Sequence, residues 1–367
     1  LSRFPASVNM PDREGLTPLA WAVDKKQVET AHMLIDAGAK LYPERLTKLQ
    51  FDILNTAVDR DSIELVNMLL AAKADPNLYA SDKSPALINA SIRGNVQIVK
   101  ELLSARADTE IRDAGHMTAI CRAVLKDRLK VVTALAAAGA NVNIPLTKSD
   151  DFESDMKEYL DYDYYREYEP PNPENCFPAT PLLLAVKRSN AEAADLLIKA
   201  GAHINAQDPR GQTPLTVAVR NGLVKLVQLL VDAKAGLEIR DTHGDTVLMK
   251  AVRNDKLKVV TALVTAGADV GALDNLNRTA LFFAHSAEVA DALIAARADV
   301  NAQSESGCTP LMAAARRRRT DVARCLLNAG AGVNDKNFAG VSALLESLSK
   351  DRKDAPLNKD IVKVLLD

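Results

Sequence analysis

Aromatic residues and long apolar runs are scarce in this 367-residue chain. Aromatics make up 4% of the residues and include a single tryptophan, although 47% of the residues are hydrophobic. No apolar run approaches the roughly 20 residues that a membrane-spanning helix needs, and no signal peptide is recognisable. The formal net charge of −2 gives no global attraction to nucleic acid or to a membrane surface. We therefore expect thin helices packed through small and aliphatic side chains.

Cysteines are also few, and none of them forms a Cys-x-x-Cys pair. The four are Cys121, Cys176, Cys308 and Cys325. Such sparse, unpaired cysteines are typical of a reducing compartment. The sequence therefore predicts a cytoplasmic location.

No pattern in the chain indicates catalysis. The five histidines are scattered with no metal-ligand spacing, at His32, His116, His203, His243 and His285. The sequence has no phosphate-binding loop and no Gly-x-Ser-x-Gly. We predict that the chain is not an enzyme and binds neither a metal nor a cofactor.

One segment, residues 206–236, explains what the chain does contain. Thr213 suits a helix N-cap, and Pro214 suits the first helical position, where an N–H is not needed. Leu215, Ala218 and Val219 then fall on one helix face, and a second apolar helix follows Gly222. Two short helices cannot bury both apolar faces alone, so the segment needs a copy of itself on each side.

Copies of this segment fill nearly the whole chain, mostly 33 residues apart. Positions equivalent to Thr213 are Thr17, Asp52, Pro85, Thr118, Thr180, Thr246, Thr279, Thr309 and Ser342. An alanine stands five residues after the anchor in nine of the ten units, from Ala22 to Ala314, and Ser347 breaks the column. Asp52 replaces threonine as a cap, and Ser84 is expected to cap a helix that begins at Pro85.

Two recurring tripeptides identify the family that these units resemble. Thr-Pro-Leu occurs at 17–19, 213–215 and 309–311, and Ala-Gly-Ala occurs at 37–39, 200–202 and 329–331. Together with the period, they resemble the ankyrin repeat family. The resemblance implies an all-α solenoid of helix-turn-helix units joined by hairpin loops. The histidine that usually follows Thr-Pro-Leu in that family is absent here, so we expect apolar packing in its place.

The repeats divide the chain into three parts. Residues 1–145 hold repeats 1–4, with the tail of a preceding repeat in 1–16, and residues 179–367 hold repeats 5–10, the last one irregular or truncated. An insertion at 146–178 lies between them. Repeat 8 is three residues short where its helices join, and repeat 9 carries four arginines, 316–319, in the same joint. The tail-like start leads us to expect a fragment of a longer protein.

Basic residues recur at the end of the predicted first helix in eight of the ten repeats, seven or eight residues after the anchor. In this family, first helices and hairpin loops line the concave face that binds proteins. We call this column the basic ladder; it comprises Lys25, Arg60, Arg93, Lys126, Lys187, Arg188, Arg220, Arg253, Arg316 and Arg317. Asp24 and Asp59 stand in the same columns. The other interpretation is local, because a cation at a helix C-terminus is stabilising by about 0.3–1 kcal/mol.

Trp21 is a further candidate for partner contact, since aromatic residues often anchor interfaces. Its position, four residues after the anchor, faces the concave side in the family. The alternative is that Trp21 covers the open end of the first repeat.

The insertion is strongly acidic and rich in tyrosine. Residues 149–174 contain ten acidic residues against Lys157 and Arg166, a local charge of −8, so the rest of the chain carries about +6. Five of the seven tyrosines lie here, Tyr159, Tyr162, Tyr164, Tyr165 and Tyr168. We predict that the insertion lies on the basic ladder near repeats 5–7, competes with an acidic partner, and is a site for tyrosine phosphorylation. A solvated loop is the alternative.

These observations favour a non-catalytic module that binds an acidic or phosphorylated protein segment along the concave face. Two alternatives stay open. The chain can be a regulatory or targeting arm of a larger enzyme, channel or secreted bacterial effector, or its basic groove can bind phosphoinositide or nucleic acid. We expect a protein partner rather than nucleic acid.

Overall fold

The computed structural model describes residues 7–13, 15–42, 52–78, 84–145, 180–208, 211–348 and 359–366. Within these ranges the chain forms short helices and turns, and the only β-bridge joins Lys336 to Ser342. The predicted all-α repeat architecture is confirmed. The insertion at 146–178, with its five tyrosines, lies outside the described residues. No helix in the described ranges combines the length and hydropathy needed to cross a bilayer.

The chain forms two compact units, Leu1–His203 and Ile204–Asp367. In the described part of the first unit, a short 3₁₀ helix η1 (Ser7–Asn9) precedes five helix pairs. The first helices of the pairs are α1 (Pro18–Asp24), α3 (Ile53–Asp59), α5 (Ala86–Arg93), α7 (Ala119–Leu125) and α11 (Pro181–Lys187). The second helices are α2 (Val28–Asp36), α4 (Ile63–Ala71), α6 (Val96–Ser104), α8 (Leu129–Ala137) and α12 (Ala191–Lys199).

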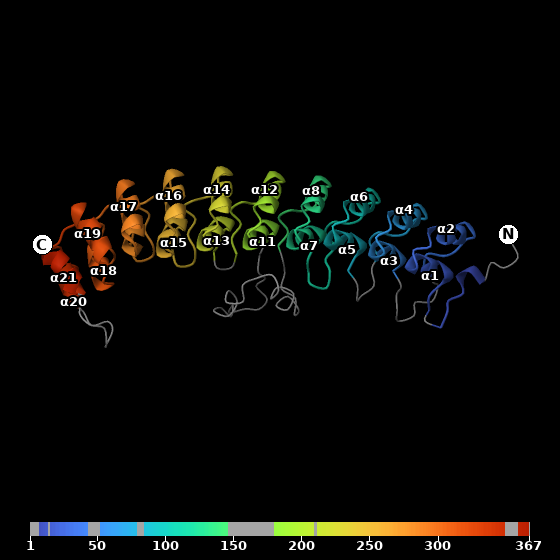
Figure 1. Cartoon of the computed structure of the whole chain (residues 1–367), viewed down its shortest axis with the longest axis horizontal. Helices are drawn as coiled ribbons and strands as arrows, with labels where there is room; N and C mark the ends of the chain where they lie inside the picture. The colour runs from blue at the N-terminus through green and yellow to red at the C-terminus, as the bar shows by residue number, and fades with distance from the viewer. Residues whose placement is uncertain are drawn as a thin grey trace. The chain divides into compact units, whose positions relative to one another are not determined.

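The described residues of the second unit also form five pairs. Their first helices are α13 (Pro214–Arg220), α15 (Val247–Arg253), the 3₁₀ helix η2 (Ala280–Phe283), α18 (Pro310–Arg316) and α20 (Ala343–Leu348). Their second helices are α14 (Val224–Asp232), α16 (Leu257–Thr265), α17 (Ala287–Ala295), α19 (Thr320–Asn328) and α21 (Lys359–Leu366). Within each unit, first helices pack on first helices and second helices on second helices, in the two rows that Figure 1 shows.

The insertion interrupts the sequence of the first unit but not its helix stack. Helix α7 packs on α11 and α8 on α12, as consecutive pairs do elsewhere. The Asn143 amide donates to the Gly201 carbonyl over 3.1 Å, and its oxygen accepts from the His203 N–H over 2.6 Å. These contacts join repeat 4 to repeat 5 directly.

Most first helices begin with the side-chain cap that the sequence predicts. The Thr213 hydroxyl accepts from the Thr216 N–H over 3.2 Å, and Asp52 accepts from the Asn55 N–H over 3.0 Å. Three lack a side-chain cap: α7 and η2, although Thr118 and Thr279 stand at their N-caps, and α5, which begins at Ala86 with Pro85 as its N-cap. The prediction of Ser84 as the cap is wrong, because the backbone of Pro85 (ψ of 149°) is still extended.

A column of alanines allows neighbouring first helices to approach closely. The alanines five residues after each anchor, from Ala22 to Ala314, are at most 4% exposed. The large residues three positions earlier, such as Leu19, Leu215 and Leu311, are fully buried beside them. Apolar packing thus holds the stack where the family's histidine is missing.

Hairpins join successive repeats, and an acidic residue closes most of them. In the hairpin before α15, the Asp241 N–H donates to the Asp245 carbonyl over 3.1 Å. Its carboxylate oxygen accepts from the Asp245 N–H over 3.0 Å. The same pair of bonds forms at Asp12, Asp113, Asp208 and Asp274, and Ser304 and Asn337 form it with neutral side chains. Each hairpin therefore sets one polar side chain beside a first helix.

The left-handed residue that follows each second helix leads to a prediction about stability. Gly267 ends α16 with φ of +89°, and a Cβ there would meet no atom within 4 Å. Lys234 takes the same place after α14 with φ of 67°, a left-handed conformation that costs side-chain-bearing residues about 1 kcal/mol. We expect Lys234→Gly to raise the free energy of unfolding by about 1 kcal/mol, measured by urea denaturation.

Gly267→Ala is the reciprocal control, because it introduces the cost that Lys234→Gly removes. It should lower the stability by a similar amount. Changes of the same sign in both variants would contradict this account of the helix ends.

Candidate functional site

Every residue of the basic ladder lies at the C-terminal end of a first helix. Arg93, Lys187, Arg220, Arg253 and Arg316 are the last residues of their helices. Lys25, Arg60, Lys126, Arg188 and Arg317 are the C-caps. Each cation therefore lies near the negative end of a helix dipole. The ladder follows the helix ends, and its effective charge depends on the carboxylates beside it.

In the first unit, aspartates of the same columns neutralise three of the rungs. Arg60 pairs with Asp24 of the preceding repeat, and Lys25 lies 3.0 Å from the same carboxylate. Hydrogen bonds from Arg60 and then Lys25 lower the pKa of Asp24. Arg93 repeats the arrangement with Asp59 at 2.9 Å. These cations already have anionic partners within the chain.

Trp21 lies on α1 beside these pairs and is 43% exposed. Its indole Nε1 donates to the Asp12 carboxylate over 2.7 Å, and the Lys25 ammonium lies 5.1 Å from the ring centroid. Two contacts thus fix the orientation of an aromatic surface that solvent can reach.

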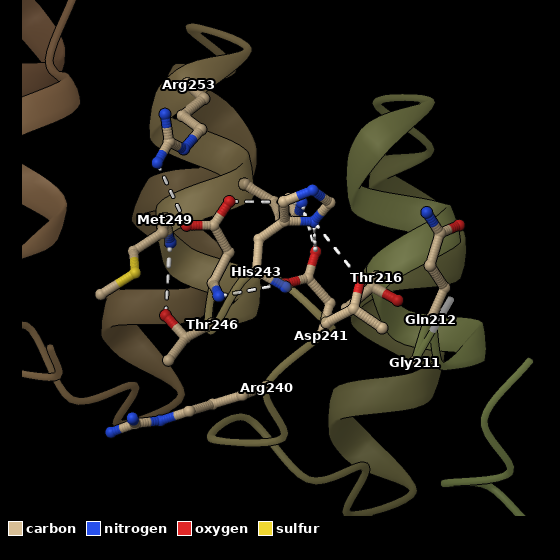
Figure 2. Close-up of polar contacts among 12 residues, drawn as sticks. Gly211, Gln212, Thr216, Arg240, Asp241, His243, Thr246, Met249 and Arg253 are labelled. Atoms are coloured by element: carbon tan, nitrogen blue, oxygen red, sulfur yellow. Dashed lines mark hydrogen bonds and ion pairs between the residues drawn. The ribbon is translucent and has the colours of Figure 1, made fainter. Parts of the chain in front are cut away.

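In the second unit, hairpin aspartates meet the first-helix cations directly. Lys250 lies 2.5 Å from Asp241 and 3.3 Å from Asp245. Arg253 lies 3.2 Å from Asp245 and 3.8 Å from Asp274. Figure 2 shows Asp241 in the hairpin before α15 and Arg253 on that helix. The acids come from two successive hairpins, so the pairs also link repeats 7 and 8.

These ion pairs extend into repeat 8, where two arginines contact a phenylalanine ring. Arg278 lies 2.7 Å from Asp274. The Arg253 and Arg278 guanidinium carbons lie 3.4 Å and 4.8 Å from the Phe283 ring centroid, a geometry that favours cation–π attraction. Burial disfavours ionisation of Asp274, but hydrogen bonds from Arg278 outweigh it and lower the pKa of that carboxyl. This ion cluster consists of Lys250, Arg253, Arg278, Asp241, Asp245 and Asp274 and is electrically neutral.

The three-residue deletion in repeat 8 explains part of the arginine run in repeat 9. The short η2 leaves carbonyls without helical donors, and arginines of the next repeat supply them. Arg317 Nη1 donates to the Phe282 carbonyl over 2.8 Å. Arg319 Nη1 donates to Phe283 and Ala284, over 3.2 Å and 2.5 Å. The sequence shows both features, but only the structure connects them.

Arg319 also contacts His285, at the joint of the shortened repeat. The Arg319 Nη2 lies 2.9 Å from the ring Nδ1 of His285. Burial and then the Arg319 charge lower the pKa of His285. The ring is therefore neutral at pH 7 and can accept this hydrogen bond through one nitrogen.

Arg316 and Arg317 differ from Arg60, Arg93 and Arg253, which pair with aspartates. Within the described part of the chain, no carboxylate lies within 4 Å of either guanidinium. Burial, followed by repulsion from Arg319 and Arg316, lowers the pKa of Arg317 to about 10. Positive charge is thus concentrated here without a directly paired carboxylate.

These two arginines line a pocket of about 290 Å³ between η2, α18 and α20. Arg278 adds a third guanidinium, while Phe282 and Met312 are buried beneath the surface. Polar residues of the preceding hairpin complete the wall, with Glu305 and Glu346 among the lining residues. The pocket combines cationic, hydroxyl and apolar groups. Sequence analysis identified Arg316 and Arg317 but missed Arg278 and the hairpin residues.

Lys126, Lys187, Arg188 and Arg220 occupy helix ends and have interaction partners of their own. No three His, Cys, Asp or Glu side chains in the described ranges lie close enough to share a metal ion.

Comparison with known families supports the repeat assignment. A family model described as ankyrin repeats (3 copies) matches residues 54–145, 156–243, 182–274, 226–304 and 278–367, well over half of the chain. A search of curated protein sequences finds no significant match.

The arginines that complete the short repeat generate a second prediction. We expect Arg319→Met to lower the free energy of unfolding by about 1–3 kcal/mol, because two carbonyls lose their donor. Arg324→Met is the matched control, because Arg324 is exposed on α19 and its ion pair with Asp321 is long, at 4.0 Å. Urea denaturation should show a change within about 0.5 kcal/mol for the control. Equal losses in both variants would contradict the capping role.

The ion cluster generates a prediction for pH. Because the pKa of Asp274 is lowered in the folded state, its ionisation stabilises the fold above its unfolded pKa of about 3.9. That contribution is lost as pH falls through the folded pKa. Asp274→Asn keeps the acceptor for the hairpin but removes the charge. Urea denaturation between pH 3 and pH 7 should show a lower stability at pH 7 and a shallower acid loss than in the wild type. Parallel pH curves would contradict the prediction.

Proposed function

Because the chain belongs to the ankyrin repeat family, we propose that its second unit binds an acidic or phosphorylated segment of a partner protein on the first-helix face. Ankyrin repeats are generally protein–protein interaction modules, and proteins built from them are typically non-catalytic. By the first-helix face we mean the first helices together with the hairpins that join successive repeats.

One observation carries this proposal. Arg316 and Arg317 have no carboxylate within 4 Å in the described chain, whereas Arg60, Arg93 and Arg253 of the same ladder do. A cation with an internal partner gains little from an external one, because the new pair must replace the old. Charge complementarity at Arg316 and Arg317 therefore supports an anionic partner at this end of the unit.

Apolar side chains on the neighbouring hairpin tips support a peptide ligand. Leu276 is 47% exposed and Phe338 is 79% exposed. Backbone hydrogen bonds tie the tips together, from Glu305 N–H to the Leu276 carbonyl and from Phe338 N–H to the Ser306 carbonyl. Interfaces combine such apolar anchors with charged groups.

The neutral ion cluster argues against nucleic acid as the ligand. A polyanion is best held by a continuous basic stripe. Here the hairpin carboxylates Asp241, Asp245 and Asp274 alternate with the cations. This arrangement supports a short acidic segment. No observation of the described chain favours the alternative of a regulatory arm in a larger enzyme, channel or effector.

A panel of equal-length acidic, phosphorylated, neutral and basic peptides tests the proposal. The full chain should prefer the anionic peptides, and added salt should weaken binding because screening shortens the reach of exposed charges. We expect Arg316→Gln to lower the affinity for anionic peptides about tenfold, because one charge-assisted contact is lost. Fluorescence anisotropy gives the affinities.

Arg60→Gln is the control in the first unit, because Arg60 pairs internally with Asp24. It should leave the affinities unchanged. A preference for basic peptides, or equal effects of Arg316→Gln and Arg60→Gln, would contradict the proposal.

The acidic insertion, with its charge of −8, is the internal competitor in this proposal. Deletion of residues 149–174 should strengthen binding of the same anionic peptides if the insertion competes with them. Unchanged affinities would remove the insertion, and its five tyrosines, from the regulatory hypothesis.

A further inference from the structure

Two repeats place an arginine at the same position but surround it differently. Arg253 in repeat 7 and Arg316 in repeat 9 each end a first helix, seven residues after the N-cap threonine. Arg253 meets Asp245, the residue before its N-cap, and Asp274, the first residue of the next hairpin. Repeat 9 provides an internal comparison for each of these positions.

In repeat 9, both carboxylates are replaced by neutral residues. Cys308 precedes the N-cap, and Asn337 begins the next hairpin. No carboxylate elsewhere in the described ranges comes within 4 Å of Arg316 or Arg317. Two negative charges that surround Arg253 are thus missing around Arg316.

The fold around Arg316 does not need those charges. The Asn337 oxygen accepts from the N–H groups of Ala339 and Val341, over 3.0 Å and 2.9 Å. The corresponding oxygen of Asp274 accepts from Leu276 and Arg278 in the same way. The substitution keeps the turn and removes only the charge.

In the pocket wall, a serine hydroxyl stands where repeat 7 has an aspartate carboxylate. The hairpin position held by Asp241 in repeat 7 is held by Ser304 in repeat 9, whose hydroxyl lies 3.1 Å from that of Ser306. Both serines line the pocket beside Arg316 and Arg317. A hydroxyl can donate to an anion, whereas an ionised carboxylate cannot. The wall therefore sets serine hydroxyls beside two arginines that have no carboxylate within 4 Å.

We infer that this pocket binds the phosphate of a phosphoserine or phosphothreonine in the partner segment. The inference rests on the proposed function and specifies the anion. A phosphate carries about −1.5 to −2 at pH 7, which matches the two missing carboxylates, whereas one aspartate or glutamate supplies a single charge. Guanidinium groups bind phosphate oxygens in bidentate pairs.

The rim of the pocket limits the ligand to one phosphate. Glu305 and Glu346 belong to the lining, and their charges oppose a second anionic group. A polyanion such as an inositol polyphosphate or an oligonucleotide is therefore disfavoured. Phe282 and Met312, both nearly fully buried, give the carbon atoms of a phosphorylated side chain an apolar floor.

Titration of the full chain with capped amino acids tests the inference. The probes are the N-acetyl, N-methylamide derivatives of phosphothreonine and of glutamate, followed through arginine Nε–Hε signals by NMR. We expect phosphothreonine to bind at least ten times more tightly than glutamate and to shift the Arg316 signal. Arg316→Gln should abolish that preference.

Asn337→Asp is the decisive variant, because it restores one internal carboxylate without changing the turn. It should weaken phosphothreonine binding at least tenfold with no loss of thermal stability. Glu346→Gln should strengthen binding, since it removes a like charge from the rim. Arg324→Gln, a charge-matched change on α19, should leave affinity unchanged.

The outcomes separate the two proposals. Equal binding of phosphothreonine and glutamate, both dependent on Arg316, would overturn the phosphate inference and leave the acidic-segment function in place. Binding of both probes without dependence on Arg316 would overturn both proposals. Undiminished phosphothreonine binding by Asn337→Asp, or tighter binding of inositol hexakisphosphate than of phosphothreonine, would also overturn the phosphate inference.

Discussion

The second unit depends on a hairpin carboxylate that serves two neighbouring repeats at once. One oxygen of Asp274 accepts from two N–H groups and closes its own hairpin. The other oxygen pairs with Arg278 and lies 3.8 Å from Arg253 of the preceding repeat. Turn geometry, the link between repeats and the charge of the first-helix face are therefore set by one side chain. Asp241 also closes its hairpin with one oxygen and pairs through the other, but with Lys250 of its own repeat.

This double role allows charge to vary while the fold stays constant. Asparagine or serine preserves the acceptor that closes the hairpin, as Asn337 and Ser304 show. The charge on the second oxygen is what disappears. A repeat stack can thus acquire a cationic pocket by changing residues that its helices do not require, because packing rests on the buried alanine and leucine columns.

The fold could be predicted from the sequence because its determinants are local and repeated. N-cap threonines, the buried alanine column and the 33-residue period all act within one repeat or between adjacent ones. The charge of the ladder could not be predicted in this way, because the aspartates that neutralise Arg253 occupy other positions of the repeat. Asp245 and Asp274 reach Arg253 only once two repeats are in register. A signal was nevertheless present, since the aspartate column changes to Ser304 and Asn337 beside the arginine run. The Ser84 cap failed for a smaller reason, because the helix starts after Pro85.

Within the arginine run 316–319, two residues stabilise the fold and a third is our candidate for binding. Arg319 and Arg317 donate to carbonyls that the shortened repeat 8 leaves without helical partners. Their loss would leave polar groups unsatisfied, which is costly in a packed stack. Arg316 makes no such bond in the described chain, although it lies on the same pocket. Folding therefore uses Arg317 and Arg319 through hydrogen bonds that Arg316 does not make. In our proposal Arg316 is left for an anionic ligand, because the carboxylates that surround Arg253 have no counterpart around it.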